Sequence, residues 1–571
     1  MRQIVSLLVL AITVLAGSID PNLAVIMASN TDTDLIPVFI LAQGQVNQNW
    51  VYVSTLGMHR EERQQFAVSA MKEIADVGQS DIINYLNTFN SISVGNIQSL
   101  WLANAVYCEV TRSVIRSIAL RSDVVLVESA CDPDGGLIEP VEVRTPNPEE
   151  RGKGLAWGVA KINADDVWSM GYEGQGIIVA VIDTGVDYEH LDLCDNMWSD
   201  TPAGYEYGWD FFNNDSDPMD DYGHGTHCAG SIAGDGSGGT QTGVAPSAQI
   251  MALRVNYYGG GEYTWIQAME FGAEHGAAVL SMSLGTDHGN TTLRTAEENL
   301  LTAGVYHSVA ASNDGPGAGT IGSSGDSPPP WFHPDQSYHG GQSAVVTVGA
   351  TDNNDVIASF SSRGPVTWWN DYNDTYPLID PDISGPGVDI VSTKWTGDSG
   401  SGFYTTMSGT SMATPHLAGV AALLLSVNPN LTVSQLDNII ETTSVDLGVS
   451  GKDNSYGAGR VDAYQAMSLA LTQTGIDNGS SGTNTFTISA ISPNPSNGFA
   501  SFSIYTSVSG LADVSVFDVS GRRVANINSS DIETGANAFN WQIPAEMGSG
   551  VYFVRASIHG NVVSSRMTVL R

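Results

Sequence analysis

The chain has 571 residues, of which 22 are Lys or Arg and 61 are Asp or Glu, so its formal net charge is −39. This length suggests about three or four domains, and an apolar content of 42% is enough to form buried cores. So acidic a chain excludes nucleic acid as a natural partner, because it has no basic stripe that could release counterions from a phosphate backbone.

The amino terminus has the pattern of an export signal. Arg2 precedes an apolar stretch from Ile4 to Ala16, and small residues follow it. This is typical of a secretory signal peptide, whereas a membrane-spanning helix needs about 20 apolar residues. We therefore predict a signal peptide over residues 1–18 and a secreted or surface-attached protein. Export permits disulfides, but the four cysteines leave three pairings open: Cys108, Cys131, Cys194 and Cys228.

A small α+β domain is predicted over residues 36–131. Apolar runs indicate its strands, and apolar positions at helical spacing indicate its helices. The expected strands are 36–41, 50–54, 106–110 and 124–129, and the expected helices are 61–77 and 81–90. The stretch 132–152, which is rich in Pro, Glu and Gly, is typical of a linker.

Residues 153–470 predict a doubly wound α/β domain with a parallel sheet. Continuous apolar runs are typical of central strands that are buried on both faces, and helical patterns separate these runs. The expected strands are 177–182, 249–255, 278–282, 305–310 and 345–348, and the expected helices are 224–233, 264–275, 291–304 and 410–428.

The carboxyl-terminal part predicts a separate β-sandwich. Residues 471–484 are polar and rich in Gly and Ser, which indicates a second linker. Short alternating runs then recur between turn residues, so an all-β sandwich is expected over residues 485–571. The expected strands are 486–491, 500–505, 512–518, 538–541, 551–557 and 564–570.

Three segments of the α/β domain carry reactive residue types. Asp183 ends the strand of VAVIDTGVD, at the edge where such sheets bind ligands. His224 and His227 lie in GHGTHCAG, and Ser411 lies at a turn into a helix in TMSGTSMATPHLA. Singly, these residues have simpler explanations, namely a turn, a weak metal pair and a helix cap. Together they supply an acid, a base and a nucleophile in the order Asp, His, Ser.

The sequence resembles the subtilases, the subtilisin-like serine endopeptidases. The matching stretches occur in family order across residues 153–470: VAVIDTGVD, GHGTHCAG, GVAPSAQIMALRV, SMSLG, VAASNDGPG, ASFSSRGP and SGTSMATPHLAGVAALLL. The resemblance implies that Asp183 orients His224, that His224 is the general base and that Ser411 is the nucleophile. It also implies that Asn313 is the side-chain donor of the oxyanion hole. The alternative, a surface-binding protein on an inactive scaffold, is disfavoured because all four residues are present.

The resemblance also implies how substrates bind. The backbone of Ser281–Gly285 would pair with an extended peptide. Leu284 and Gly285 would form one wall of the pocket for the side chain before the scissile bond. The segment Ala310–Ser312, which includes Ala311 and Ser312, would form the other wall. This pocket is therefore expected to prefer apolar or aromatic side chains. The expected substrates are proteins or peptides, and the enzyme is expected to be a monomer. Two stretches, 328–341 and 368–377, are insertions relative to small subtilisins.

Calcium is the expected cofactor. Residues 162–253 contain no Lys or Arg and 16 acidic side chains, and 210–221 places acids and amides at the alternate positions that suit Ca²⁺. This stretch resembles the calcium loop of thermitase-like subtilases, which implies the ligands Asp210, Asn213, Asp215 and Asp217. Asp192 matches a calcium ligand of the family and implies a second site with the loop 234–242. A solvated acidic turn is the alternative.

Cys228 lies four residues after His224. The resemblance to thermitase-like and proteinase K-like subtilases implies a free thiol behind the base. The alternative is that Cys228 is simply a small buried apolar residue.

The flanking units are also interpreted by resemblance. Residues 36–131 are placed and patterned like a subtilase propeptide, which implies a chaperone and inhibitor that is cut off within about 132–153. A retained accessory domain is the alternative. The tail resembles sorting domains of the Por secretion type, in SPNPSNG, VSVFDVSGRRV and the final 24 residues. This implies secretion machinery and the cell surface of a Gram-negative-type bacterium, with an accessory β-domain as the alternative.

Overall fold

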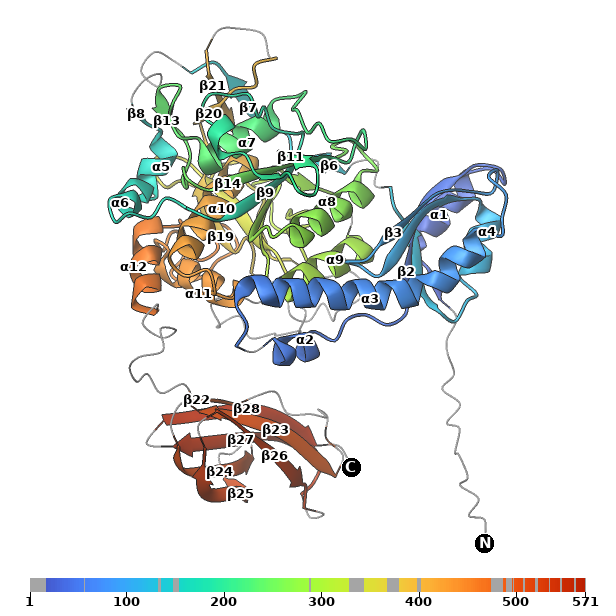
Figure 1. The fold of residues 1–571 in the computed structure, drawn as a ribbon, viewed down its shortest axis with the longest axis vertical. Coiled ribbons are helices and arrows are strands. Elements are labelled where there is room, and N and C mark those ends of the chain that lie inside the picture. Colours follow the sequence, from blue (N-terminus) through green and yellow to red (C-terminus); the bar gives the residue numbers. More distant parts are fainter. Residues whose placement is uncertain are drawn as a thin grey trace. The chain divides into compact units, whose positions relative to one another are not determined.

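The computed structural model describes residues 17–55, 57–131, 135–146, 154–286, 289–327, 344–366, 379–397 and 402–473, and 486–569 with short gaps. Two compact units are present, Met1–Thr472 and Gln473–Arg571 (Figure 1). The apolar core of the predicted signal peptide, most of the second linker and both predicted insertions lie outside the described residues.

The first part of the larger unit is an α+β domain, as predicted. Its five-stranded sheet has the order β1-β5-β2-β4-β3. The strands are β1 (Ser18–Ile19), β2 (Ile36–Ala42), β3 (Val94–Leu100), β4 (Ala105–Val110) and β5 (Val124–Ser129). The helices are α1 (Pro21–Ser29), α2 (Gln48–Ser54), α3 (Arg60–Leu86) and α4 (Arg112–Ile118).

Two predictions in this domain were wrong. The stretch 50–54 was predicted as a strand but forms most of α2, because the Asn47 side chain accepts a hydrogen bond from the Trp50 N–H and caps a helix there. The two predicted helices form the single helix α3. Gly78 lies inside α3, where a Cβ would lie only 3.0 Å from the Asn104 side chain. Close packing explains this glycine.

The second part is the predicted doubly wound α/β domain. Its main sheet has seven parallel strands in the order β12-β14-β9-β15-β17-β18-β19. These strands are β9 (Ile178–Asp183), β12 (Gly208–Asp210), β14 (Gln249–Arg254), β15 (Val279–Met282), β17 (Tyr306–Ala310), β18 (Val346–Thr351) and β19 (Ile383–Pro386). The helices are α5 (Trp157–Lys161), α6 (Ala164–Trp168), α7 (His224–Ala233), α8 (Glu262–Glu274), α9 (Thr291–Thr302), α10 (Thr410–Val427), α11 (Val433–Thr443) and α12 (Ala463–Gln473).

Helices cover both faces of this sheet, as β9 illustrates. Val179 and Val181 pack into a core with residues of α7 and α10, whereas Ala180 and Ile182 pack into a second core with residues of α8 and α9. Because both faces of the strand are buried, apolar and polar residues do not alternate along it. The sequence of the strand is therefore a continuous apolar run.

Shorter strands border the main sheet. They are β8 (Gly154–Leu155), β10 (Ser199–Asp200), β11 (Tyr205–Glu206), β13 (Thr240–Gln241), β16 (Leu284–Gly285), β20 (Ile390–Thr393) and β21 (Tyr404–Ser408), together with β6 (Gly136–Leu137) and β7 (Glu142–Arg144) from the predicted linker. In the described part of the chain, only α10 is long and apolar enough to cross a membrane, with a mean hydropathy of 1.4. Since 89% of that stretch is buried, α10 is a core helix of the α/β domain.

The carboxyl-terminal unit has two antiparallel sheets, of the orders β22-β23-β26 and β25-β24-β27-β28, around one apolar core. The predicted β-rich fold is therefore confirmed. Its strands are β22 (Phe486–Ile488), β23 (Phe499–Thr506), β24 (Gly510–Asp518), β25 (Arg523–Ile532), β26 (Gly535–Gln542), β27 (Gly550–Ile558) and β28 (Asn561–Val569). The strand β25 was not predicted, because it is an edge strand with many polar residues and therefore a weak apolar pattern.

Candidate active site

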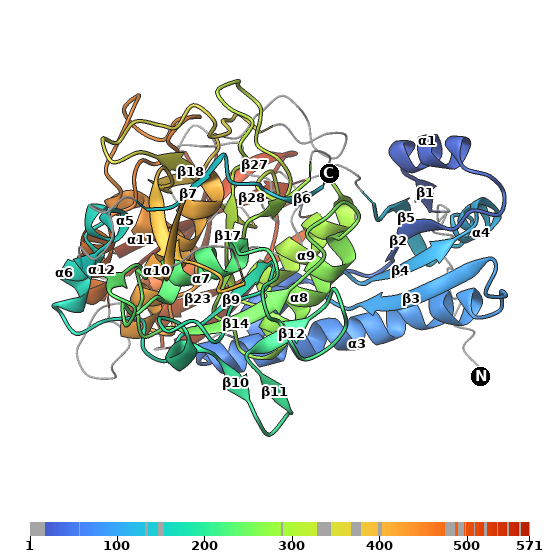
Figure 2. The ribbon, with the colours of Figure 1, turned by 90° about the horizontal axis from the view of Figure 1, so that it is seen from above.

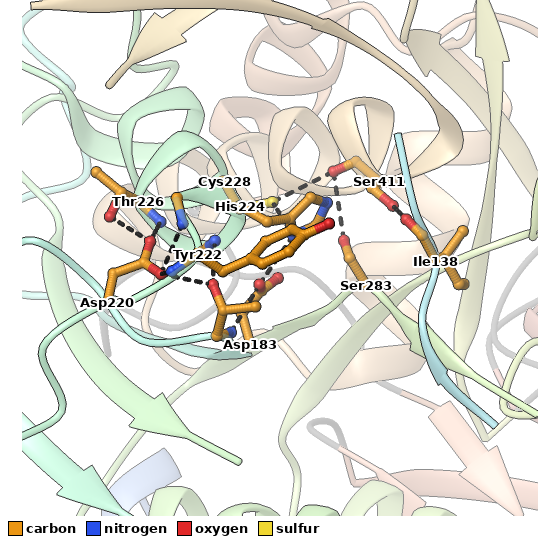
Figure 3. A network of polar contacts seen from close by, with 12 residues as sticks. Ile138, Asp183, Asp220, Tyr222, His224, Thr226, Cys228, Ser283 and Ser411 are labelled. Carbon is orange, nitrogen blue, oxygen red and sulfur yellow. Dashed lines mark hydrogen bonds and ion pairs between the residues drawn. The ribbon is translucent and has the colours of Figure 1, made fainter. Parts of the chain in front are cut away.

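Three side chains from three elements converge at the carboxyl end of β9 (Figure 3). Asp183 ends β9, His224 begins α7, and Ser411 lies in the first turn of α10. The Asp183 Oδ1 and His224 Nδ1 atoms are 2.8 Å apart. All three side chains are buried. The carboxylate therefore fixes the orientation of the imidazole ring.

Asp220 holds the loop that leads into α7. Its carboxylate accepts hydrogen bonds from three backbone N–H groups and two hydroxyls: Tyr222, Gly223 and Thr226 N–H, and Thr184 and Thr226 Oγ1. Because Thr184 directly follows Asp183, this network joins the end of β9 to the start of α7. Gly225 permits the close approach, since a Cβ there would lie 2.1 Å from the Gly185 oxygen.

Asn313 is aimed at the same place by a tight turn after β17. Ser312 has a φ of 81°, in the left-handed region that non-glycine residues seldom adopt. The Asn313 Oδ1 atom accepts hydrogen bonds from the Thr410 N–H and hydroxyl, both at 3.0 Å. These contacts orient the Nδ2 group as a donor, and it donates to the Glu139 oxygen at 2.8 Å.

A segment of the chain itself covers the site, and we call residues 136–144 the covering segment. Its strand β6 pairs antiparallel with β16, and its strand β7 pairs antiparallel with β21; Figure 2 labels β6 and β7. Between these strands, the Ile138 N–H donates to the Ser283 oxygen at 3.0 Å and the Val141 N–H donates to the Ser408 oxygen at 2.7 Å. The predicted linker therefore lies as an extended peptide on both sides of Ser411.

Ser411 and Asn313 contact two successive carbonyl groups of this segment. The Ser411 Oγ atom donates to the Ile138 oxygen at 2.7 Å (Figure 3), while Asn313 holds the oxygen of Glu139. For acyl transfer, the carbonyl that serine attacks must be the one that the oxyanion donor holds. Because the two contacts are divided between neighbouring peptide groups, neither bond is positioned for attack.

The environment of His224 combines burial with a negative charge. Burial lowers the pKa of His224, but the Asp183 carboxylate outweighs this effect, and the pKa stands well above its usual value. The Cys228 Sγ atom lies 3.8 Å from His224 Nδ1 and is buried, so burial raises the pKa of this thiol. His227 points elsewhere, toward the Ile390 oxygen, and burial lowers its pKa to about 3.

Comparison with known proteins decides the family. The model of the subtilase family matches residues 174–459, which is half of the chain. The chain belongs to the subtilase family. This subtilase is 35% identical to thermitase of Thermoactinomyces vulgaris over 54% of its own length and 95% of that protein. It is 34% identical to subtilisin DY of Bacillus licheniformis, over 55% of its length and 98% of that protein. The subtilase is therefore a serine endopeptidase.

Other comparisons extend this result. The subtilase is 37% identical to the serine protease AprX of Bacillus subtilis, over 52% of its own length and 66% of that protein. Residues 490–570 match the model of the secretion system C-terminal sorting domain. The tail therefore marks this subtilase as a secreted or cell-surface protein.

The predicted substrate-binding residues of the subtilase lie in three places. Leu284 and Gly285 pair with Leu137 and Gly136 of the covering segment. Ser281 lies inside β15, between β9 and β17. The other two predicted residues, Ala311 and Ser312, are buried; the Ala311 N–H donates to the Val348 oxygen, and the Ser312 oxygen accepts from the Ser362 N–H.

The predicted calcium ligands are engaged with groups of the chain. The Asp210 carboxylate is paired with Arg254 Nη1 at 2.5 Å and accepts the Asn213 side-chain amide at 2.9 Å. The Asp215 carboxylate accepts from the Asp217 N–H, and the Asp217 carboxylate accepts from the Tyr188 hydroxyl and the Met219 N–H. In this arrangement, Arg254 already neutralises Asp210, so Asp210 is not available as a calcium ligand.

Asp192, the residue of the second predicted site, accepts hydrogen bonds from the Gly238 N–H and the Tyr404 hydroxyl, and burial raises its pKa. A carboxyl group with a raised pKa is a weaker cation ligand. Calcium therefore stays a prediction.

Asp220, Tyr222 and the covering segment were not predicted from the sequence as parts of the site. Asp220 had a usable signal, because it lies four residues before the motif histidine in an acidic loop. The covering segment had none, since its partners β16 and β21 are 140 or more residues away. The structure also shows free thiols on Cys108, Cys194 and Cys228.

Proposed function

We propose that this subtilase hydrolyses peptide bonds through a Ser411 acyl-enzyme. His224 Nε2 removes the Ser411 proton as the serine oxygen attacks, and it then returns the proton to the leaving amine. Asp183 holds the imidazole in the required tautomer. Asn313 Nδ2 and the Ser411 N–H receive the negative charge of the carbonyl oxygen. The observation that carries this proposal is the convergence of Ser411 and Asn313 on a bound extended peptide.

Labelling with a fluorophosphonate probe tests this mechanism. The protein recovered from culture should be labelled and should cleave denatured casein, and Ser411→Ala should lose both properties. Ser426→Ala, at the other end of α10, is the matched control because its hydroxyl donates to the Leu423 oxygen within its own helix turn. Labelling that persists in Ser411→Ala would contradict the proposal.

The proposal includes a precursor in which the amino-terminal domain is the inhibitor. Its interface with α8 and α9 supports this role. Glu270 of α8 accepts the Leu102 N–H at 2.8 Å, and Glu128 accepts the N–H groups of Thr291 and Thr292 at the start of α9. The rings of Tyr107 and Tyr263 stack across the same interface at 4.1 Å.

The covering segment supports inhibition more directly. It lies on the site without presenting a bond for attack. The residue after Glu139 is Pro140, and because its ring includes the backbone nitrogen, the peptide group between them has no N–H. We propose that the chain cuts itself within about 132–153 after this segment has moved. The full chain with Ser411→Ala should then remain intact, while the unsubstituted chain loses its amino-terminal domain. Loss of that domain from Ser411→Ala, made alone, would contradict self-processing.

The final part of the proposal concerns export. The amino-terminal pattern supports a signal peptide over residues 1–18, and the sorting domain supports recognition by secretion machinery in a Gram-negative-type bacterium. Deletion of residues 485–571 should retain the enzyme inside the cell envelope. Unchanged export of the shortened protein would contradict the sorting role.

A further inference from the structure

Tyr222 lies at the rim of the active site, two residues before His224. Its backbone N–H donates to Asp220 at 2.9 Å, which ties the residue to the network below His224. Its ring lies against Tyr257, with 5.7 Å between ring centroids. Although Tyr222 is 44% exposed, its position is therefore fixed on both sides.

The Tyr222 hydroxyl meets the Glu139 carboxylate of the covering segment. Its oxygen lies 2.7 Å from Glu139 Oε2 and 2.9 Å from Oε1. A phenol has one proton to donate, so the two oxygens share one hydrogen bond. Burial and this carboxylate raise the pKa of Tyr222 to about 12, so the hydroxyl is a donor at neutral pH.

In the backbone register of the covering segment, Glu139 occupies the place of the residue after the scissile bond of a substrate, although the segment's own bond is not positioned for attack. Ile138 bonds to Ser283 through its N–H, and its carbonyl meets Ser411. A Cβ on Gly285 would lie 3.2 Å from Ile138 Cδ1, so the Ile138 side chain lies on the wall predicted for the residue before the cut. Glu139 is the next residue and directs its side chain to Tyr222.

Among the described residues, Tyr222 is the donor that binds this carboxylate. The adjacent cation, Arg254, is paired with Asp210 and Asp221. The Tyr257 hydroxyl donates to Asp221 at 2.9 Å. A neutral phenol can therefore bind an acidic side chain here by donating a hydrogen bond to its carboxylate.

We propose that Tyr222 is a specificity-determining residue that selects substrates with an acidic side chain directly after the scissile bond. This inference rests on the proposed function, because it names a preference of the same site. The overall negative charge of the domain opposes acidic substrates, so the preference should appear at this position and not elsewhere along the peptide.

Quenched fluorescent peptides test the preference. Their sequence is that of residues 135–142 with Pro140→Ala, which permits cleavage, and residue 139 is Glu or Gln. For the protein recovered from culture, kcat/KM should be about fivefold higher with Glu than with Gln, mainly through KM, as expected for an exposed hydrogen bond to a charged group. In Tyr222→Phe, which removes only the hydroxyl, the ratio should approach one. Equal rates in the unsubstituted protein, or a preference that persists in Tyr222→Phe, would overturn the proposal.

A second measurement does not need turnover. In the full chain with Ser411→Ala, hydrogen exchange of the Ile138 and Val141 amides reports how firmly the covering segment is held. Tyr222→Phe and Glu139→Gln should each accelerate this exchange about fivefold, and the double variant should add nothing further. If no peptide is cleaved, the proposed hydrolysis fails, and this exchange decides the role of Tyr222. Unchanged exchange in the single variants would overturn it.

Discussion

A rise in pH should loosen the hold of the amino-terminal domain on α8. The group responsible is Glu270, which is buried in the interface and accepts the Leu102 N–H. Burial raises its pKa to about 8 from its ordinary 4.5, against the opposing effects of that N–H and of Lys72. The docked carboxyl is therefore protonated at a pH where the exposed carboxyl of an undocked α8 is ionised.

The sign and size of the effect follow from this shift. Stabilisation by a group with a raised pKa is complete below about pH 4.5 and is lost as the pH rises to about 8. Between these limits, each pH unit weakens docking by up to about tenfold. From pH 5.5 to 7.5, the docking constant should therefore fall about 70-fold, or about 2.5 kcal/mol.

The assay is hydrogen exchange of the Leu102 amide in the full chain with Ser411→Ala, corrected for the intrinsic pH dependence of exchange. Protection should fall across this range. Glu270→Gln keeps the size and the acceptor but cannot ionise, so its slope should be much smaller. Glu128 should contribute to the remaining slope, because burial raises its pKa as well. Protection that rises with pH, or the same slope in Glu270→Gln, would refute the reasoning.

Further predictions concern the site and its support. Asn313→Ala should lower kcat about 10²–10³-fold with little change in KM, the loss known for such a donor in subtilisin; an unchanged kcat in a peptide assay would exclude the oxyanion role. Gly225→Ala should lower stability by about 1–3 kcal/mol in urea unfolding, because its Cβ meets the Gly185 oxygen at 2.1 Å; an unchanged midpoint would argue against this contact. Arg254→Met should cost about 3 kcal/mol because it leaves the buried Asp210 unpaired. Calcium should then raise the Tm of Arg254→Met more than that of the unsubstituted protein, and if calcium and chelator leave both Tm values unchanged, the calcium prediction is wrong.

The parallel sheet and the catalytic motifs could be predicted because their signals are local. A strand such as β9 reads as a continuous apolar run since both of its faces are buried. The residues around Asp183, His224 and Ser411 form short motifs that hold their turns together. Gly225 belongs to such a motif because no side chain fits beside Gly185.

The failures depend on contacts that are distant in the sequence. The covering segment looked like a linker because its strands form only against β16 and β21. The acidic loop suggests calcium because its charges can be counted in the sequence, whereas the partner of Asp210, Arg254, could not be foreseen because it lies on another strand. A short pattern likewise misassigned 50–54, where the side chain of Asn47 decides for a helix.

The position of Ser411 on α10 has a consequence for heat inactivation. The side chains from Met412 to Leu425 on this helix are buried, and a Cβ on Gly419 would lie 2.6 Å from Val244. A nucleophile on a surface loop can be displaced by local opening while the rest of a protein stays folded. Ser411 can be displaced only together with the core, so activity and the folded state should disappear at the same temperature.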